Sequence, residues 1–242
     1  MRAKVSVVLC SYNGQKYIQK QIESILVQLE PGDELIIQDD LSNDQTFKIL
    51  QRFKQSKIKI FQNEANIGFV KNFLSAIQKA SNEIILLSDQ DDIWLENRLN
   101  LMYEVYQKDS LVISDFKEVD DNLNRISSIN NDSRTLKLSK TRLGQFLDVF
   151  FGRNKYYGCC FLFSKKFFSE CYPPSSFIPS HDIWLAINAS LHGKIILCHK
   201  ITLLRRIHSM NVSSHNPRRF YLKIIDRIRL GLAILYGIVT SK

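Results

Sequence analysis

Short apolar runs alternate with amphipathic segments through the first hundred residues. The runs are about four to eight residues long and rich in β-branched residues, which is typical of buried strands. Between them, apolar positions recur at helical spacing. Strands that alternate with helices predict an α/β fold, with a mostly parallel sheet and helices on both faces. The predicted strands are residues 5–11, 34–38, 58–62 and 83–88, and the predicted helices are residues 17–29, 47–53 and 68–80.

The second half of the chain is less regular than the first. Residues 115–140 are polar and rich in Asn, Ser and Asp, which predicts a long loop or insertion. In the first half, the four residues from Ser42 to Gln45 match a capping box for the second helix. Beyond residue 140 the pattern predicts a helix over 141–151, a strand-like run over 156–164, a helix over 183–191, a strand over 194–198 and a basic helix from residue 217 onward.

Charge is distributed unevenly along the chain, which carries a formal net charge of +9. Residues 133–242 contain only four acidic residues, so the excess of Lys and Arg lies in the second half. Such asymmetry suggests an anionic partner, which could be nucleic acid, a phospholipid surface or a phosphorylated ligand. A solubilising face is the alternative. The basic segment 216–242 suits a helix in the membrane interface, or a helix that packs on the domain or on a second subunit.

Cysteine usage and apolar run length bear on the cellular compartment. The five cysteines have no disulfide-scaffold spacing, which indicates reduced thiols in a cytoplasmic protein. The longest apolar run, residues 230–239, is about half of what a bilayer span needs, so we expect no transmembrane helix.

Polar residues follow the predicted strands where each strand ends. Asp39 and Asp40 follow the second strand, and Asp89, Asp91 and Asp92 follow the fourth. Ligands of parallel sheets bind beyond this edge, and five carboxylates there would repel one another without a cation. Oxygen ligands suit Mg²⁺ or Mn²⁺, which would in turn bind a diphosphate. An Asp at a strand end also caps turns and helices, and we favour that alternative for Asp39, Asp40 and Asp44 taken alone.

Several nucleotide and hydrolase signatures are absent from the sequence. There is no GxGxxG after the first strand and no GxxxxGK[ST], which argues against a dinucleotide dehydrogenase and a P-loop nucleotidase. GxSxG and HExxH are also missing. The acidic cluster after the fourth strand is therefore the strongest chemical signal in the first half.

Six stretches, in order along residues 4–212, resemble the motifs of family 2 glycosyltransferases, most closely those of bacterial members that add rhamnose or a similar sugar to surface polysaccharides such as O-antigen or capsule. The resemblance implies an inverting, metal-dependent enzyme of the Rossmann-like GT-A fold. It implies a GT-A domain over 1–215, with a nucleotide-binding half (1–114) and an acceptor-binding half (115–215), followed by the basic segment 216–242. The stretches are VSVVLCSYNG (5–14), IQDDLSNDQT (37–46), NEANIGFVKNF (63–73), LSDQDDIW (87–94), HDIWL (181–185) and RRIH (205–208).

The resemblance implies a nucleotide pocket at the ends of the first strands. Ser11 and Tyr12 would line it, with the Tyr12 ring available to stack on the base. Asp40 would accept a hydrogen bond from the base, although its neighbour Asp39 could do so instead. Asn66 would lie beside the donor, and a turn before a helix is the alternative role for its segment.

The resemblance also implies a metal site and a catalytic base. Asp89 and Asp91 correspond to the family's DxD motif, with Asp89 near the ribose and the metal and Asp91 on the metal. His208 would join the metal, and a solvated loop histidine is the alternative. Asp182 would be the general base that deprotonates the acceptor hydroxyl, and it could also be the N-cap of the predicted helix 183–191.

The expected partners follow from these roles. They are a dTDP- or UDP-linked sugar, a glycan acceptor carried on a lipid, and an anionic membrane surface, but no nucleic acid. The protein would then be cytoplasmic and peripheral at the inner face of the cell membrane. A basic nucleic-acid-binding protein is one alternative, and a non-catalytic nucleotide-sugar-binding subunit of the same fold is another.

Overall fold

The structure is a computed structural model, and it describes residues 2–126, 136–154, 156–171, 178–209, 211 and 220–240. In chain order its elements are β1 (Val5–Ser11), α1 (Ile18–Leu26), β2 (Glu34–Asp39), α2 (Thr46–Leu50), β3 (Ile58–Gln62), α3 (Phe69–Gln78), β4 (Ile84–Ser88), β5 (Ile93–Trp94), α4 (Arg98–Glu104), β6 (Leu111–Val119), α5 (Arg142–Phe150), the 3₁₀ turn η1 (Gly158–Cys160), β7 (Phe161–Ser164), α6 (Lys165–Cys171), α7 (His181–Leu191), β8 (Ile195–Arg206) and α8 (Phe220–Thr240).

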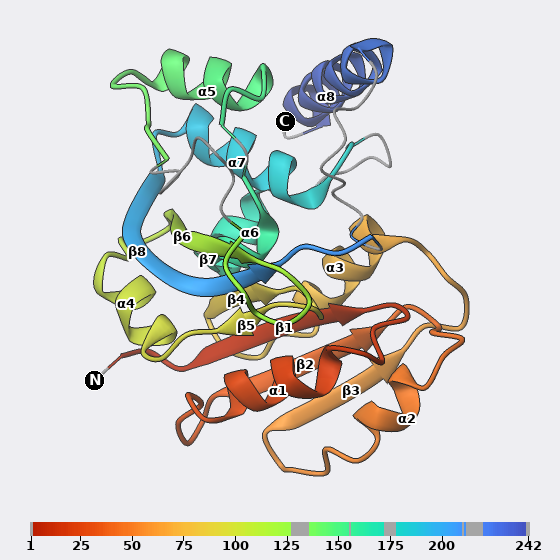
Figure 1. Cartoon of the computed structure of the whole chain (residues 1–242). Helices are drawn as coiled ribbons and strands as arrows, with labels where there is room; N and C mark the ends of the chain where they lie inside the picture. The colour runs from red at the N-terminus through yellow and green to blue at the C-terminus, as the bar shows by residue number, and fades with distance from the viewer. Residues whose placement is uncertain are drawn as a thin grey trace.

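The first four strands form the parallel half of the sheet, in the order β3-β2-β1-β4. Strands β1, β2 and β4 are buried along their whole length, because helices cover both faces. Helices α1 and α2 lie on one face, and α3 lies on the other with α6 and α7 (Figure 1). The predicted α/β class and the helices on both faces are confirmed. The carboxyl ends of these strands share one edge, and this edge positions the site.

The second half of the chain extends the same sheet. Strand β7 pairs antiparallel with β4 and with β6, and β8 then runs parallel to β6, with β5 at the edge. The predicted strand 194–198 is too short, because β8 continues to Arg206 by pairing with β6. Its far end carries Arg205 and Arg206 to the loop after β4, where Arg206 N–H donates to Asp92.

Two predicted segments of the second half differ from the structure. The predicted loop 115–140 is wrong in its first part, because β6 runs through Val119 and its Asp115–Val119 portion pairs with β8. Residues 127–135 of that segment lie outside the described residues. The strand-like run 156–164 is a strand only from Phe161, since Gly158–Cys160 form a 3₁₀ turn.

Two helix starts also differ from prediction. Ser42 does not cap α2, whose N-cap is Gln45 without a side-chain bond. The Ser42 hydroxyl instead donates to Asp39 at 2.6 Å and accepts from Asn13 N–H at 2.9 Å, tying together the loops after β1 and β2. Helix α7 begins at His181, not at residue 183, and Ser180 is its N-cap. Asp182 therefore lies in the first turn of α7 and is not its cap.

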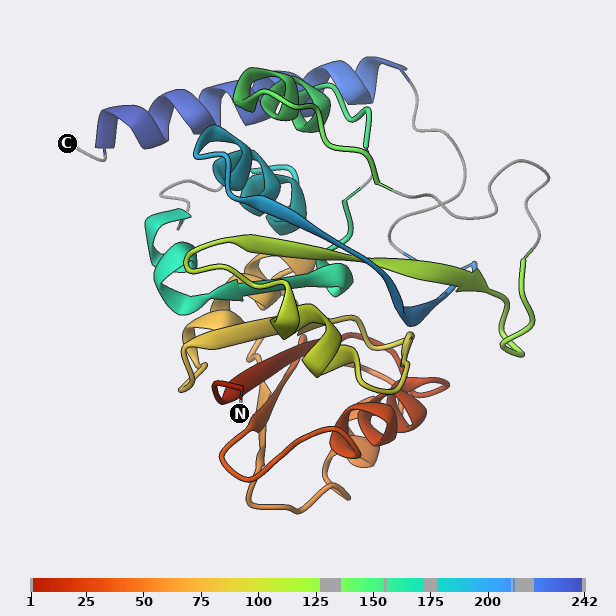
Figure 2. The ribbon, with the colours of Figure 1, turned by 90° about the vertical axis from the view of Figure 1, so that its left-hand side faces the viewer.

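Helices α5 and α8 form an outer layer on the side of the molecule away from α1 and β3 (Figures 1 and 2). Leu230 and Ala233 of α8 are buried in the core. No helix among the described residues is long and apolar enough to cross a membrane. All five cysteines are buried and carry no disulfide, as expected of reduced thiols.

Candidate active site

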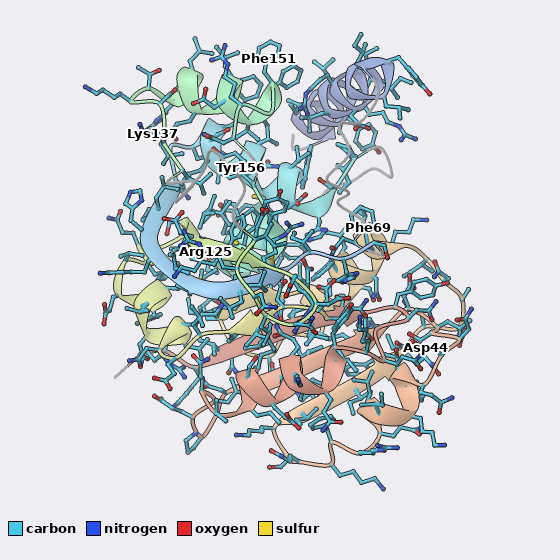
Figure 3. The ribbon with its side chains drawn as sticks, in the orientation of Figure 1. Asp44, Phe69, Arg125, Lys137, Phe151 and Tyr156 are labelled. Atoms are coloured by element: carbon cyan, nitrogen blue, oxygen red, sulfur yellow. The ribbon has the colours of Figure 1, made fainter. Side chains whose placement is uncertain are left out.

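A cavity of about 650 Å³ opens beyond the carboxyl ends of β1 and β4. Its walls come from segments far apart in the chain, such as Phe69 at the start of α3 and Tyr156 after α5 (Figure 3). This is the edge at which open α/β sheets bind their ligands. The predicted site residues that line it are Ser11, Tyr12, Asp40, Asn66, Asp89, Asp91 and Asp182.

Gln90 lines the floor of the cavity and was not among the predicted site residues. Its Oε1 accepts the N–H of Tyr12 at 2.8 Å, and its Nε2 donates to the carbonyl oxygen of Tyr12 at 2.9 Å. A Cβ at Gly14 would overlap the same amide, so glycine at this position leaves room for the Gln90 side chain. The pair of bonds joins the loops after β1 and β4. It places the Tyr12 ring, which is 44% exposed, at the cavity.

The carboxylates after β2 organise the neighbouring loops. Asp39 accepts from the hydroxyls of Ser11 and Ser42 at 2.9 and 2.6 Å. Asp40 accepts from the N–H groups of Ile67 and Gly68 at 2.9 and 2.8 Å, and so fixes the segment that contains Asn66. Both carboxylates are buried, and Asp40 alone of the two lines the cavity. The predicted hydrogen bond from Asp40 to a base stays a prediction.

His208 meets Asp91 although 117 residues separate them. Its Nε2 lies 2.8 Å from Asp91 Oδ2, and Asn211 Nδ2 donates to the same oxygen at 3.0 Å. The imidazole stacks on the Tyr17 ring with 4.7 Å between centroids. The alternative of a solvated loop histidine is wrong, because the His208 side chain is only 7% exposed.

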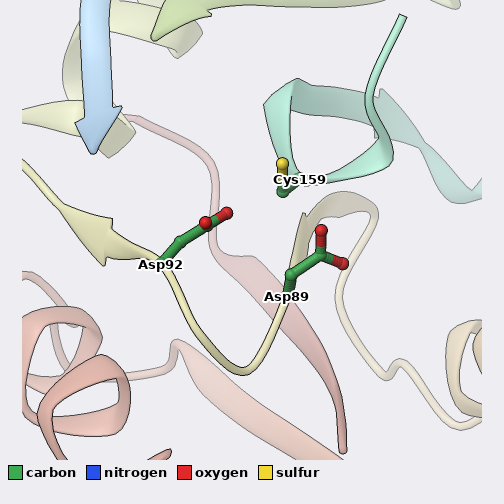
Figure 4. A group of neighbouring side chains, drawn as sticks. All are labelled: Asp89, Asp92 and Cys159. Atoms are coloured by element: carbon green, nitrogen blue, oxygen red, sulfur yellow. The ribbon is translucent and has the colours of Figure 1, made fainter. Parts of the chain in front are cut away.

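Asp89, Asp92 and Cys159 lie together beside this pair (Figure 4). Each offers a ligand atom, and these atoms all lie within 4.8 Å of one another. Asp92 Oδ2 is buried and has no hydrogen-bond partner among the described residues. Burial and the negative charge of Asp91 raise the pKa of Asp89 to about 7 and also raise the pKa of Asp92. A cation at this point would relieve both effects.

A buried arginine supports this wall of the cavity and was missed in the sequence. Arg98 is fully buried, and its guanidinium lies 4.8 Å from the Trp94 ring centroid. It donates to the carbonyl oxygen of Cys159 at 2.5 Å and to the hydroxyl of Thr202. Arg98 thereby joins η1 to β8, and the only sequence signal for it is its place four residues after Trp94.

Asp182 faces the cavity from the first turn of α7. Its Oδ1 accepts the N–H of Ile183 at 2.8 Å, and no described donor contacts its other oxygen. The negative charge of Asp182 also raises the pKa of Asp89, although less than burial and the charge of Asp91 do. The carboxylates of Asp182 and Asp89 therefore interact electrostatically. The other oxygen of Asp182 is therefore available to a ligand in the cavity.

The sheet and its carboxylate-lined cavity define an open α/β protein with a ligand site beyond the carboxyl edge of the sheet. The sequence profile described as "Glycosyl transferase family 2" matches residues 6–171. The chain belongs to this family. The solved structure of S. aureus TarS 1–349 in complex with UDP-GlcNAc superimposes with a TM-score of 0.66 at 21% identity, over 92% of this chain and 65% of that one. The fold is therefore the GT-A fold expected from the resemblance.

Two curated relatives show which named enzymes the chain is similar to. The first is the UDP-Glc:alpha-D-GlcNAc-diphosphoundecaprenol beta-1,3-glucosyltransferase WfgD of Escherichia coli, 36% identical over 44% of this chain and 42% of its own length. The second is the dTDP-rhamnosyl transferase RfbG of Shigella flexneri, 34% identical over 38% of this chain and 34% of its own length. The matches to these relatives thus span less than half of their length.

Proposed function

We propose that the chain transfers a sugar from a nucleotide-diphosphate sugar to a hydroxyl of a glycan acceptor, with inversion at the anomeric carbon. One observation carries the proposal: in a chain of this family, Asp89, Asp91 and Asp182 face one cavity at the carboxyl edge of the sheet. The names of WfgD and RfbG support a UDP- or dTDP-linked donor. We propose rhamnose or a similar hexose as the sugar, and synthesis of surface polysaccharide such as O-antigen or capsule as the process.

The nucleotide occupies the part of the cavity above β1. The Tyr12 ring, held in place through its backbone by Gln90, stacks on the base. Ser11 lies at the end of β1, and Asn66 lies on the loop that Asp40 fixes. Asp40 already accepts a hydrogen bond from Asn63 Nδ2 at 2.7 Å. The base N–H would have to bind the same carboxylate alongside this donor.

The residues of the acidic wall fit Mg²⁺ or Mn²⁺. Asp91 and His208 already approach each other as two ligands of one ion would, and Asp89 adds a carboxylate beside them. Asp92 Oδ2, which has no hydrogen-bond partner among the described residues, lies in the same acidic wall. A cation there would supply the positive charge that this oxygen lacks. A divalent ion held there would neutralise the diphosphate leaving group. The Cys159 thiol stays protonated, because its hydrogen bond with Cys160 and its burial raise its pKa.

The chain's own chemistry is a proton transfer at Asp182. Its free oxygen takes the proton of the acceptor hydroxyl, and that hydroxyl oxygen attacks the anomeric carbon from the face opposite the diphosphate. The bond to the diphosphate breaks as the new glycosidic bond forms, so a single displacement inverts the configuration.

We further propose that α8 holds the protein on an anionic membrane, where a lipid-linked acceptor would lie. Its exposed large apolar residues share one arc of the helix, because helical residues advance by about 100° each. Such a patch is unusual on a soluble surface. Arg227, on the inner side of α8, lines the cavity and thus connects this helix to the site. The exposed residues are Tyr221, Leu222, Ile224, Ile225, Ile228, Leu232, Leu235 and Tyr236.

Calorimetric titration with UDP- and dTDP-sugars tests the donor and the metal together. We expect binding in Mg²⁺ or Mn²⁺, loss of binding in excess EDTA, and loss of transfer in Asp91→Asn with an unchanged melting temperature. Removing one member of a repulsive acidic group should not unfold the domain. Glu170→Gln, at an exposed residue of α6, is the matched control. Equal binding and transfer in EDTA would contradict the metal-dependent reaction.

A further inference from the structure

Arg227 is a cation of the cavity that the proposed reaction does not use. It comes from α8, and a Cβ on Gly152, just after α5, would lie 2.5 Å from its Nη2. The guanidinium makes no hydrogen bond or ion pair within the part of the chain that the structure describes. Its nitrogens are nevertheless not among the buried polar atoms that lack a partner, so a ligand can reach them.

Positive charge is scarce in this cavity. Among the described residues that line it, only Arg205 and Arg227 carry a permanent positive charge. Arg205 belongs to the acidic wall, because its Nη1 lies 3.3 Å from Glu118 and its charge opposes the rise in the pKa of Asp89. Burial lowers the pKa of Arg227, but an arginine keeps its charge at neutral pH. An anionic group of a ligand would therefore find its partner in Arg227.

The place of Arg227 in the fold indicates which anion this is. Successive helical residues advance by about 100°, so Arg227 points away from the exposed apolar arc that includes Ile225 and Ile228. Helix α7, which carries Asp182, lies between α8 and the sheet (Figures 1 and 2). From the outside inward, α8 and α7 thus present an apolar surface, a cation and the proposed base. A lipid-linked glycan has the matching order of apolar chain, phosphate and sugar hydroxyl.

We propose that Arg227 binds a phosphate group that joins the acceptor glycan to its lipid. The inference rests on the proposed function, in which the acceptor is lipid-linked. A guanidinium presents parallel N–H donors that match two oxygens of a phosphate. This contact holds the phosphate at the α8 side of the cavity and leaves the sugar to extend toward Asp182. The diphosphate of the donor is the other phosphate that could reach Arg227.

Calorimetric titration with octyl phosphate, below its micellar concentration and in excess EDTA, tests the contact. The probe combines an apolar chain with a phosphate, and EDTA prevents it from binding to the acidic wall through a metal ion. Arg227→Gln should bind it about tenfold or more weakly, as for the loss of a charged hydrogen bond, and Arg227→Lys should recover part of the affinity. Octyl glucoside, a neutral probe with the same chain, should bind Arg227→Gln and the wild type equally.

Arg229→Gln is the matched control, because Arg229 is an exposed arginine of the same helix that does not line the cavity. It should bind octyl phosphate as the wild type does. Arg227→Gln should keep the melting temperature of the wild type, since the substitution removes no hydrogen bond of the described residues. Wild-type affinity for octyl phosphate in Arg227→Gln, or an equal loss in Arg229→Gln, overturns the proposal.

Titration with UDP in Mn²⁺ separates the two sources of the phosphate. If the acceptor carries it, Arg227→Gln and the wild type bind UDP equally. A loss of about tenfold in UDP affinity would assign Arg227 to the donor diphosphate and overturn its assignment to the acceptor. If the wild type binds neither UDP nor a nucleotide-sugar but binds octyl phosphate through Arg227, the proposed function fails and the phosphate contact stands.

Discussion

At the scale of single residues, the position of Asp182 allows a clean test of catalysis. Because Ser180 caps α7, Asp182→Asn should keep the helix while removing the basicity of the side chain. Loss of a general base costs about 10²–10⁴-fold in rate. We therefore expect turnover to fall by that factor, with nearly unchanged affinity for the nucleotide-sugar. Steady-state kinetics and titration measure the two quantities, and Glu170→Gln again serves as the control. A variant within a few-fold of the wild type would remove Asp182 from the reaction.

Asp33 provides a residue-scale prediction for the pH dependence of stability. It accepts from Arg2 at 2.5 Å and from the N–H groups of Val5 and Glu30 at 3.0 and 2.8 Å. Burial alone would raise its pKa, but these bonds outweigh burial and lower the pKa below the usual 3.8. A lowered pKa stabilises the fold above pH 3.8, and this contribution is lost as pH falls through the pKa of the folded state.

Asp33→Ala should therefore cost about 3 kcal/mol of unfolding free energy near neutral pH and progressively less as pH falls below about 4. Urea unfolding at several pH values measures this difference. Glu64→Ala, at an exposed residue after β3, is a control that removes the same charge. An equal cost for Asp33→Ala at all pH values would show that its charge is not what stabilises the fold.

At the scale of elements, the loops after β1 and β4 act as one unit through Gln90 and Gly14. Gly14→Ala should displace the Gln90 amide, cost about 1–3 kcal/mol of stability and weaken UDP binding, since Tyr12 loses its backbone support. The double variant Gly14→Ala with Gln90→Ser should regain stability but not UDP affinity. Thermal unfolding and UDP titration check both effects. Additive losses in the double variant would mean that the two residues act independently.

The elements also show how far the sequence alone could lead. Strands β1 and β2 could be placed to within a residue, and the acidic edge followed from them, because apolar periodicity is a local property of the chain. Strand β8 could not be placed in full. Its polar residues Thr202 and Arg205 are buried by pairing with β6, and that pairing is not encoded locally. The bond from Tyr12 to Gln90, which spans 78 residues, is hidden from the sequence for the same reason.

At the scale of the whole molecule, α8 presents its apolar arc on the outside while Arg227 reaches the cavity. Ile228→Asp together with Leu232→Asp should leave the fold intact, because both side chains are exposed. The pair should lose binding to phosphatidylglycerol vesicles, since each buried apolar side chain contributes to membrane affinity. Transfer to a short soluble acceptor should be unchanged.

Co-sedimentation with vesicles and a transfer assay measure the two properties of this double variant. Leu143→Asp, at an exposed position of α5, is the matched control for an added charge on the surface. A double variant that co-sediments as well as the wild type would contradict membrane binding by α8. If the double variant forms smaller oligomers but still co-sediments with vesicles, the apolar arc of α8 is a contact between copies of the chain.

Asp91 and His208, which are in contact in the folded protein, are synthesised at different times. The parallel strands, with Asp91 just after the fourth, leave the ribosome first and can form their hydrogen bonds as they emerge. His208 follows 117 residues later. At about 5–20 residues per second, this delay is roughly 6–23 s. If His208 is a metal ligand, as proposed, a nascent chain that stalls in between has Asp91 but lacks this ligand.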